Sequence, residues 1–411
     1  MKYIIIGFGG RGCMYSWYFK NCGAELVGVC DTNPERLELA KTSHGLSAEQ
    51  LYSAADDILS GEKKGELCVV STQDSSHHRI AVQALSRGYD LLLEKPIAGK
   101  LSECEEIASL ADKLQRRVFV CHVLRYAPFF RKLKEELETG KYGRISTINQ
   151  TENVGYWHQA HSYVRGNWRR EETSTPMILA KCCHDLDIIS WLIGEDCEYV
   201  SSMGNLRFFT RENRPKEAAD RCTDCSLRDI CAYSAVRFYL GKFDAGEKGW
   251  PCDVLALHPT RESLTEALRT GPYGRCVFAC DNDVVDHQVV NMQFRGGATA
   301  HLTMTAFSAD SYREIHVHAE YGDIYGNMEE NILHCNLFGA GSRTINIGDY
   351  VESDKMAGHG DGDGRLIRDI VNVYENKPSF GLTEIGKSVQ SHKIAFAAEE
   401  SRKKQGEVVR V

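Results

Sequence analysis

The chain has 411 residues, which is long enough for two domains that each bury a core. Its formal net charge of -8 argues against nucleic acid or an anionic membrane as a partner. No apolar run approaches the length of a membrane span, and the first residues enter a strand without a leader-like segment. We therefore expect a cytoplasmic protein, in which the 16 cysteines are thiols or metal ligands.

A glycine-rich turn follows the first expected strand. The apolar run Tyr3–Ile6 is typical of a strand buried on both faces, and Gly7, Gly9 and Gly12 follow it with G-x-G-x-x-G spacing. Gly7 allows the tight turn, Gly9 lets a pyrophosphate approach the backbone, and Gly12 lets the next helix pack on the strand. That helix, expected over 11–20, would direct its free N–H groups at the phosphates. The pattern predicts a dinucleotide site.

An acidic residue at the expected distance, Asp31, follows a second apolar strand over 24–30. Its carboxylate would accept hydrogen bonds from the adenosine ribose hydroxyls and repel a 2′-phosphate. This favours NAD over NADP, although the nearby Arg36 keeps NADP as an alternative. The competing interpretation is that Asp31 only caps the following helix.

The pattern of the chain changes after residue 123. Residues 1–121 alternate six strands with helices, which predicts a doubly wound parallel sheet of Rossmann order. Beyond them, period-2 alternation predicts strands over 144–154, 284–294, 298–307 and 314–320. Helices are expected over 177–192, 365–374 and 383–401.

We therefore predict an α/β protein with two domains. Residues 1–121 form an NAD-binding Rossmann domain. Residues 122–411 form a substrate-binding and oligomerisation α+β domain with a large, mostly antiparallel open sheet. A cysteine-rich, loop-rich insertion is expected at about 204–280. The free face of the open sheet favours a homodimer or homotetramer.

Three cysteines of this insertion, Cys222, Cys225 and Cys231, have the spacing of a zinc site. Cys276 is our choice for the fourth ligand, with Cys252 and Cys280 as alternatives. The spacing does not match an iron–sulfur cluster. Structural zinc and three free thiols stay open as interpretations.

Several further motifs occur at strand and helix ends: TQDSSH at 72–77, EKP at 94–96, LRYAP at 124–128, and His184-x-x-Asp187. With GFGGRG at 7–12, they make the chain resemble the Gfo/Idh/MocA oxidoreductases, the family of glucose–fructose oxidoreductase and inositol dehydrogenase. The resemblance covers nearly the whole chain. It departs from the family at Gln73-Asp74, where Pro-Asn is usual, and at Ala180, where many members have Asp.

The resemblance implies which residues perform the chemistry. Lys95 would hydrogen-bond the reacting hydroxyl, because a carbinol that loses hydride needs a base for its proton and a cation for the alkoxide. His184 would be the acid or base, with Asp187 fixing its tautomer. Lys181 would replace the missing Asp. The competing interpretations are a surface lysine held near Glu94 and a histidine that only caps its helix.

The resemblance and the loop motif together predict the cofactor-binding residues. They are Gly7, Phe8, Gly9, Gly10, Arg11, Gly12, Asp31, Ser71, Thr72, Asp74, His77, Glu94, Lys95, Arg125, Trp168 and Arg169. Tyr156 and His158 would line the sugar side. His359 and Asp363 could face the same cleft, and the competing interpretation, which we prefer, is a glycine-rich helix start capped by Asp.

Three functions follow from this reading. The first is an NAD-dependent oxidoreductase acting on a carbinol of a sugar, cyclitol or glycoside. The second is an NAD-dependent glycosidase that oxidises its substrate transiently, eliminates the glycosidic substituent and reduces the product again. The third is a non-catalytic sensor of NAD and a ligand, which the retention of Lys95 and His184 argues against.

Overall fold

The computed structural model describes residues 1–351, 359–381 and 383–411. Its first sheet is wholly parallel, with the strand order β3-β2-β1-β4-β5-β6. This is the doubly wound order that the sequence predicts. The strands are β1 (Lys2–Ile6), β2 (Glu25–Cys30), β3 (Leu51–Tyr52), β4 (Leu67–Val70), β5 (Asp90–Leu93) and β6 (Val118–Val120).

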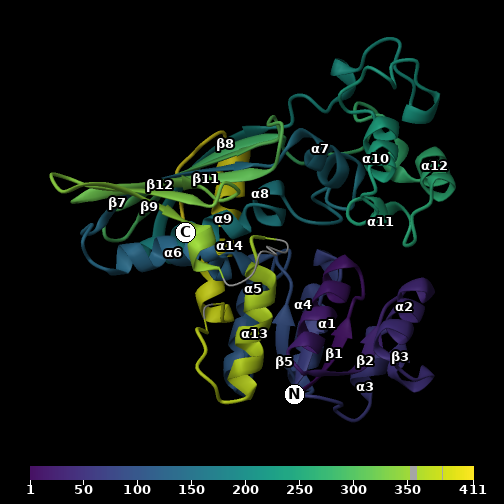
Figure 1. The fold of residues 1–411 in the computed structure, drawn as a ribbon, viewed down its shortest axis with the longest axis horizontal. Coiled ribbons are helices and arrows are strands. Elements are labelled where there is room, and N and C mark those ends of the chain that lie inside the picture. The colour runs from purple at the N-terminus through teal and green to yellow at the C-terminus, as the bar shows by residue number, and fades with distance from the viewer. Residues whose placement is uncertain (352–358, 382) are drawn as a thin grey trace.

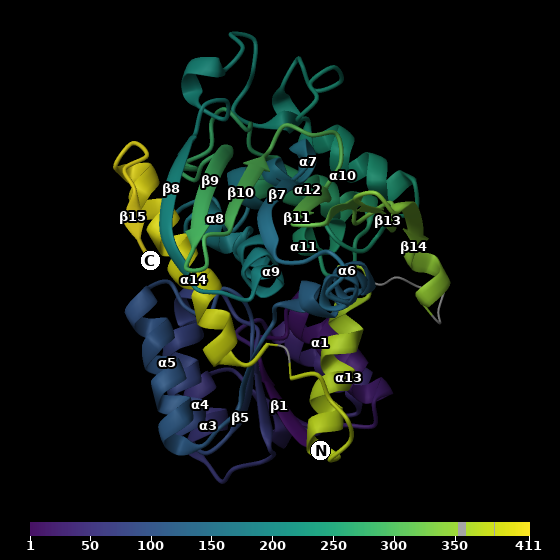
Figure 2. The ribbon, with the colours of Figure 1, turned by 90° about the vertical axis from the view of Figure 1, so that its left-hand side faces the viewer.

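Helices cover both faces of this sheet. Those inside the first domain are α1 (Gly10–Asn21), α2 (Pro34–His44), α3 (Ala55–Ser60), α4 (His77–Ser86) and α5 (Leu101–Leu114). Two helices from the end of the chain complete the layers: α13 (Gly362–Tyr374) packs beside α1, and α14 (Ile385–Lys403) packs beside α5 (Figure 2). The first sheet therefore shares its hydrophobic core with the C-terminal tail.

The second sheet has nine strands in the order β14-β13-β12-β11-β7-β10-β9-β8-β15. Its neighbours pair antiparallel except β7 and β10, which confirms a mostly antiparallel sheet (Figure 1). The strands are β7 (Ile145–Asn153), β8 (Cys197–Asn205), β9 (His287–Phe294), β10 (Thr299–Thr305), β11 (Tyr312–Ala319), β12 (Gly322–Asn327), β13 (Ile332–Leu337), β14 (Gly341–Asn346) and β15 (Val409–Arg410).

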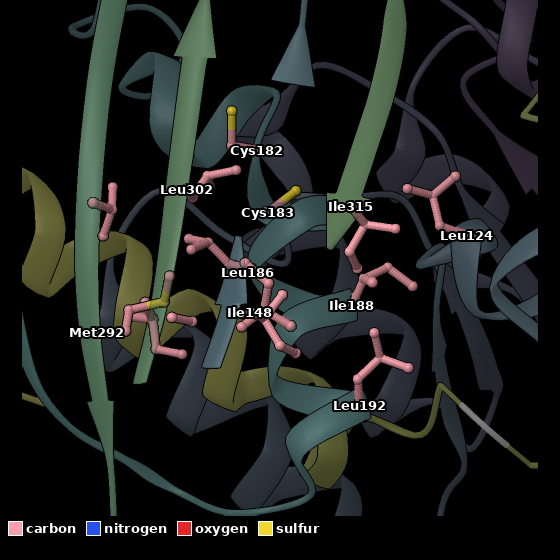
Figure 3. Close-up of a cluster of buried hydrophobic side chains, with 14 of the residues drawn as sticks. Leu124, Ile148, Cys182, Cys183, Leu186, Ile188, Leu192, Met292, Leu302 and Ile315 are labelled. Atoms are coloured by element: carbon pink, nitrogen blue, oxygen red, sulfur yellow. The ribbon is translucent and has the colours of Figure 1, made fainter. Parts of the chain in front are cut away.

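One face of this sheet packs on helices, including α6 (Pro128–Glu138), α8 (Met177–Ala180) and α9 (Cys183–Ile193). Figure 3 shows Leu186 and Ile188 of α9 against Ile148, Leu302 and Ile315 of the strands. The single helix predicted over 177–192 is wrong, because the chain breaks between α8 and α9 at Lys181 and Cys182. The break frees carbonyl groups that a continuous helix would have used.

The segment between β8 and β9 holds no strand and carries α10 (Ala235–Asp244), α11 (Cys252–Leu255) and α12 (Arg261–Thr270). These helices form a small core of their own and project beyond the sheet, next to α7 (Tyr156–His158) (Figure 1). None of the helices in the described ranges combines the length and apolar character that a bilayer crossing requires.

Candidate active site

The glycine-rich loop has the shape that a pyrophosphate needs. Gly7 has φ +93°, and a Cβ there would lie 2.6 Å from the Ser71 carbonyl oxygen. A Cβ on Gly12 would overlap the Gly7 carbonyl oxygen, whereas one on Gly9 or Gly10 would meet no atom of the described residues within 4 Å. The space above the loop is therefore open, and α1 begins there without a side-chain cap on its N–H groups. These features fit a dinucleotide phosphate.

Asp31 is tied to this loop. Its Oδ2 accepts a hydrogen bond from the Phe8 backbone N–H at 2.6 Å, and its Oδ1 accepts one from Asn33 N–H at 2.8 Å. The cap of α2 is Asn33, whose side chain accepts from Glu35 N–H. Asp31 is therefore not the helix cap, and its carboxylate lies beside the phosphate loop.

Arg11 and Glu94 bind each other. Arg11 Nε lies 2.5 Å from Glu94 Oε1, and the Tyr15 hydroxyl donates to the same oxygen at 2.6 Å. The Arg11 guanidinium also donates to Asp363, 2.8 Å away, and Asp363 in turn binds His359 Nδ1 at 2.9 Å. Burial disfavours the charged form of Glu94, but Arg11 and Lys95 hold its pKa below the ordinary value. Arg11 and Glu94, which were both predicted to contact the cofactor, thus neutralise each other's charge within the protein.

Lys95 lies at the end of β5, next to this network. Its Nζ donates a hydrogen bond to the Ala180 carbonyl oxygen at 2.7 Å. That carbonyl is available because α8 ends at Ala180. Ala180, where the resemblance led us to expect Asp, thus offers Lys95 a main-chain acceptor in place of a side chain.

His184 lies in the first turn of α9 and is 3% exposed. Its ring centre is 5.6 Å from that of His359 and 5.9 Å from that of His122. Burial, followed by the nearby charge of Lys95, lowers its pKa well below 6.5, so its imidazole is neutral at pH 7. Among the described residues, its Nδ1 has no hydrogen-bond partner.

The predicted role of Asp187 is wrong. Its two carboxylate oxygens accept hydrogen bonds from Arg125 Nε and Nη2, both at 2.7 Å. Arg125 is 3% exposed, and its guanidinium also lies 5.9 Å from the Trp191 ring centre. Since an arginine fork matches a carboxylate geometrically, this pair is a buried support of the site.

Lys181 belongs to a buried charge cluster that the sequence did not indicate. Its Nζ is 3.1 Å from Glu152 Oε1, and Glu152 Oε2 is 2.8 Å from Arg313 Nη2. Arg313 Nε also binds Asp185 Oδ1 at 2.9 Å. Glu152 on β7 pairs with Arg313 on β11, and both side chains are buried. Charged residues at inward-facing strand positions could therefore have indicated this cluster from the sequence.

Most of the remaining predicted cofactor residues link neighbouring loops. Ser71 Oγ donates to the Gly7 carbonyl oxygen at 2.7 Å. The imidazole of His77 bridges the carbonyl oxygens of Thr72 and Pro96, at 3.2 and 2.8 Å. The loop after β4 is thereby fixed against both the glycine-rich loop and the Lys95 segment.

The neighbouring residues Trp168 and Arg169 bind two different parts of the protein. Trp168 Nε1 donates to Asp74 Oδ1 at 3.3 Å, which brings the C-terminal domain onto the loop after β4. Arg169 instead binds Asp281 with two hydrogen bonds of 2.9 and 3.2 Å. Its guanidinium is thus engaged by the end of the insertion.

A group of aromatic side chains, His158, Trp157 and Trp250, lies on the predicted sugar side of the site. The His158 ring lies 5.2 Å from that of Trp250 and 5.5 Å from that of Trp157. Burial, followed by the charges of Lys181 and His161, lowers the pKa of His158 well below 6.5. Trp250 is 50% exposed, so the insertion places an accessible indole beside the predicted sugar side.

The four cysteines predicted as zinc ligands border one cavity of about 30 Å³. Nevertheless, within the described ranges no group of three or more His, Cys, Asp or Glu side chains is arranged to hold a metal ion. Cys222 Sγ instead accepts the Ala235 N–H at 3.5 Å and a weak contact from Arg165 at 3.8 Å. As the thiols stand here, the zinc site predicted from their spacing is not formed.

Two family models match this chain and together cover most of it. Residues 1–122 match the family model described as an oxidoreductase family, NAD-binding Rossmann fold. Residues 134–409 match the model described as an oxidoreductase family, C-terminal alpha/beta domain.

Two curated relatives and one solved structure illustrate the likeness. YteT of Bacillus subtilis, named as an oxidoreductase, is 25% identical over 84% of this chain and 82% of its own. An inositol 2-dehydrogenase/D-chiro-inositol 3-dehydrogenase of Lactiplantibacillus plantarum is 25% identical over 61% of this chain and 67% of its own. Levoglucosan dehydrogenase, solved with NADH and L-sorbose, shares the fold with a TM-score of 0.73, at 19% identity over 100% of this chain and 98% of its own.

Proposed function

We propose that this chain, which belongs to the Gfo/Idh/MocA family of NAD(P)-dependent oxidoreductases, uses NAD to accept or supply a hydride at a carbinol of a sugar, cyclitol or glycoside. The open space above Gly9 and the position of Asp31 support the binding of NAD there. The relatives whose names refer to inositol and levoglucosan support a polyhydroxylated substrate.

The observation that carries the proposal is the hydrogen bond of Lys95, just after β5, to the Ala180 carbonyl oxygen, with the neutral His184 close enough to feel the lysine charge. Lys95 is held by a carbonyl, which orients its ammonium and leaves the charge available to a developing alkoxide. His184 is neutral, and its Nδ1 has no hydrogen-bond partner in the part of the chain that the structure describes, so it would take the hydroxyl proton. Lys181, fixed by Glu152, would bind a neighbouring hydroxyl.

A panel of sugars, cyclitols and glycosides tests the proposal. NADH formation is followed by absorbance with NAD in excess, with the Lys95→Met variant as control. The proposal predicts that at least one polyhydroxylated compound gives NADH with the wild-type protein and that the variant is at least a hundredfold slower. Absence of any redox change across the panel would contradict it.

A transient-oxidation glycosidase is the second proposal, favoured by the Lys181–Glu152 pair. Elimination requires a base for the acidified C–H and an acid for the leaving group, in addition to the groups that serve the hydride step. Lys181 with Glu152 supplies such a second acid–base pair. With nitrophenyl glycosides and catalytic NAD, this activity would release nitrophenol without net NADH. Stoichiometric NADH would assign the protein to net oxidation instead.

A structural zinc ion stays a proposal for Cys222, Cys225, Cys231 and Cys276. It is supported by the cavity that all four border, into which their sulfur atoms would turn to reach about 2.3 Å from one ion. Metal analysis of purified protein tests it. About one zinc per chain, lost with Cys225→Ser, would support the site, and metal-free protein would refute it.

We also propose that the protein is a homodimer or homotetramer joined through the outer face of the nine-stranded sheet. That face exposes the rings of Tyr325 and Tyr199, 40% accessible each, and a ladder of His316, His318 and His334. Light scattering of wild-type protein and of Tyr325→Glu tests the assembly. A wild-type monomer would contradict it.

A further inference from the structure

The segment 250–258 of the insertion crosses from the predicted sugar side towards the nucleotide domain. At its start, the Trp250 ring lies 5.4 Å from that of Trp157 and 5.2 Å from that of His158. Cys252 is fully buried, and its thiol donates to the Tyr239 carbonyl oxygen of α10 at 3.7 Å. The segment is therefore anchored to the site at one end and to the core of the insertion behind it.

Asp253, three residues after Trp250, faces the nucleotide-binding domain. Burial raises the pKa of Asp253, and the Arg36 guanidinium of α2 opposes that rise. Burial also raises the pKa of the Cys13 thiol of α1, with Arg36 lowering it and Asp253 raising it further. Asp253, Arg36 and Cys13 are thus electrostatic neighbours, although they belong to three separate elements.

A cavity of about 680 Å³ separates the same segment from α2. Glu35, Glu38, Leu39 and Thr42 line one side, and residues 255–258 line the other. Its size is that of a typical small-ligand site, and its leucines suit an aromatic base. The two carboxylates would repel a 2′-phosphate. Because α2 follows directly on Asp31, this cavity adjoins the expected place of the adenosine ribose.

We propose that residues 250–258 form the outer wall of the cofactor cleft, contact the adenosine half of bound NAD and slow its release. Figure 1 shows the insertion, with α11, on the side of the molecule that faces α1 and α2. This proposal depends on the proposed binding of NAD by the N-terminal domain, but it does not depend on which substrate the enzyme uses. Its consequence is that the cofactor stays bound over many turnovers, as repeated oxidation and reduction of one substrate would require.

Release of NADH from the preformed complex tests this wall without any substrate. NADH fluorescence is followed in a stopped-flow instrument after mixing with excess NAD. Trp250→Ala and Asp253→Arg should each release NADH at least tenfold faster than the wild type, because one removes the anchor and the other repels Arg36. The matched control is Asp229→Arg, an exposed aspartate of the same insertion, which should release NADH at the wild-type rate.

Hydrogen exchange of the wild-type protein gives a second readout that does not depend on the folding of variants. Saturating ADP-ribose, which contains the adenosine half without nicotinamide, should slow exchange in the peptide that covers 250–258 at least fivefold. The peptide around Asp229 should not change. Unchanged exchange over 250–258, or release rates within twofold of wild type in both variants, would overturn the wall. Since neither measurement uses a sugar, failure here is separate from failure of the proposed reaction.

Discussion

The ammonium of Lys95 donates a hydrogen bond to the main-chain carbonyl oxygen of Ala180, 2.7 Å away. The two residues are joined because the helix predicted over 177–192 stops at Ala180 and restarts at Cys183. A carbonyl orients the lysine without neutralising it. Many family members carry Asp at the position of Ala180. The Ala180 side chain is only a methyl group, but its main-chain carbonyl still contacts the lysine.

Lys95→Met should lower kcat by 10²–10⁴-fold and leave NADH affinity nearly unchanged. The lysine stabilises charge that develops only in the transition state, so its loss appears in kcat rather than in cofactor binding. Steady-state kinetics and NADH fluorescence titration measure the two quantities. Lys100→Met, whose side chain is 75% exposed, is the control. Wild-type turnover in Lys95→Met would move the role to Lys181.

The pH dependence of kcat/KM should carry the signature of His184. Burial, followed by the charge of Lys95, lowers its pKa well below 6.5, so the imidazole is still a neutral base at pH 6.5. The rate of oxidation should thus fall only below pH 6.5, and His184→Ala should be slow and lack this acidic fall. A wild-type midpoint above pH 7 would exclude His184 as the base.

Lys181→Met should destabilise the protein by about 1.5–3 kcal/mol, because it removes a charge-assisted hydrogen bond from buried Glu152. The double variant Lys181→Met/Glu152→Gln should recover part of this loss, since it also removes the buried negative charge that Lys181 neutralised, while Arg313 keeps its ion pair with Asp185. Urea unfolding measures both. Lys100→Met, which breaks the exposed pair with Glu103, should change stability by less than about 0.5 kcal/mol. Additive effects of the two substitutions would show that the pair is not coupled.

His392 should make the protein sensitive to acid. Its Nε2 accepts the Ile97 N–H at 2.9 Å, so protonation would break that bond, and burial with His122 lowers its pKa to about 3. The unfolded chain takes up the proton near pH 6.5, as an ordinary histidine does. Stability is therefore unaffected by this group above pH 6.5 and is lost as the pH falls from 6.5 towards 3.

The loss from one such histidine approaches about 1.4 kcal/mol per pH unit. Replacing His392 by Gln should flatten the fall in the free energy of unfolding between pH 6 and 4.5 by up to that amount. Denaturant unfolding at several pH values measures the slope. The same slope in variant and wild type would show that His392 does not titrate between the two states.

NAD should bind at least tenfold more tightly than NADP, a difference of about 1.4 kcal/mol. Asp31 lies beside the phosphate loop and would repel a 2′-phosphate. Asp31→Ser should reduce the preference and weaken NAD itself, because Phe8 N–H loses its partner. Titration of both cofactors measures this, and equal affinity in the wild type would contradict the assignment.

The sequence by itself determined the parallel sheet, the glycine-rich nucleotide-binding loop and four of the nine strands of the second sheet, β7, β9, β10 and β11. Local signals suffice for these features. The apolar strand and the glycines Gly7, Gly9 and Gly12 that follow it lie within about ten residues of one another. Period-2 alternation of apolar and polar residues predicts β7, β9, β10 and β11. The position of Lys95 just after β5 was also predictable, and its catalytic role stays a prediction based on ligands binding at the carboxyl ends of parallel strands.

Only the tertiary structure decided which charges meet. Asp187 was expected to serve His184 one turn away, yet it binds Arg125 from a segment 62 residues earlier. Glu152, Arg313 and Lys181 lie far apart in the chain and meet because β7 pairs with β11 and α8 breaks before α9. The electrostatic effect of Arg36 on Asp253 likewise depends on where the insertion folds. Long-range pairing of this kind has no local periodicity, so no spacing along the chain records it.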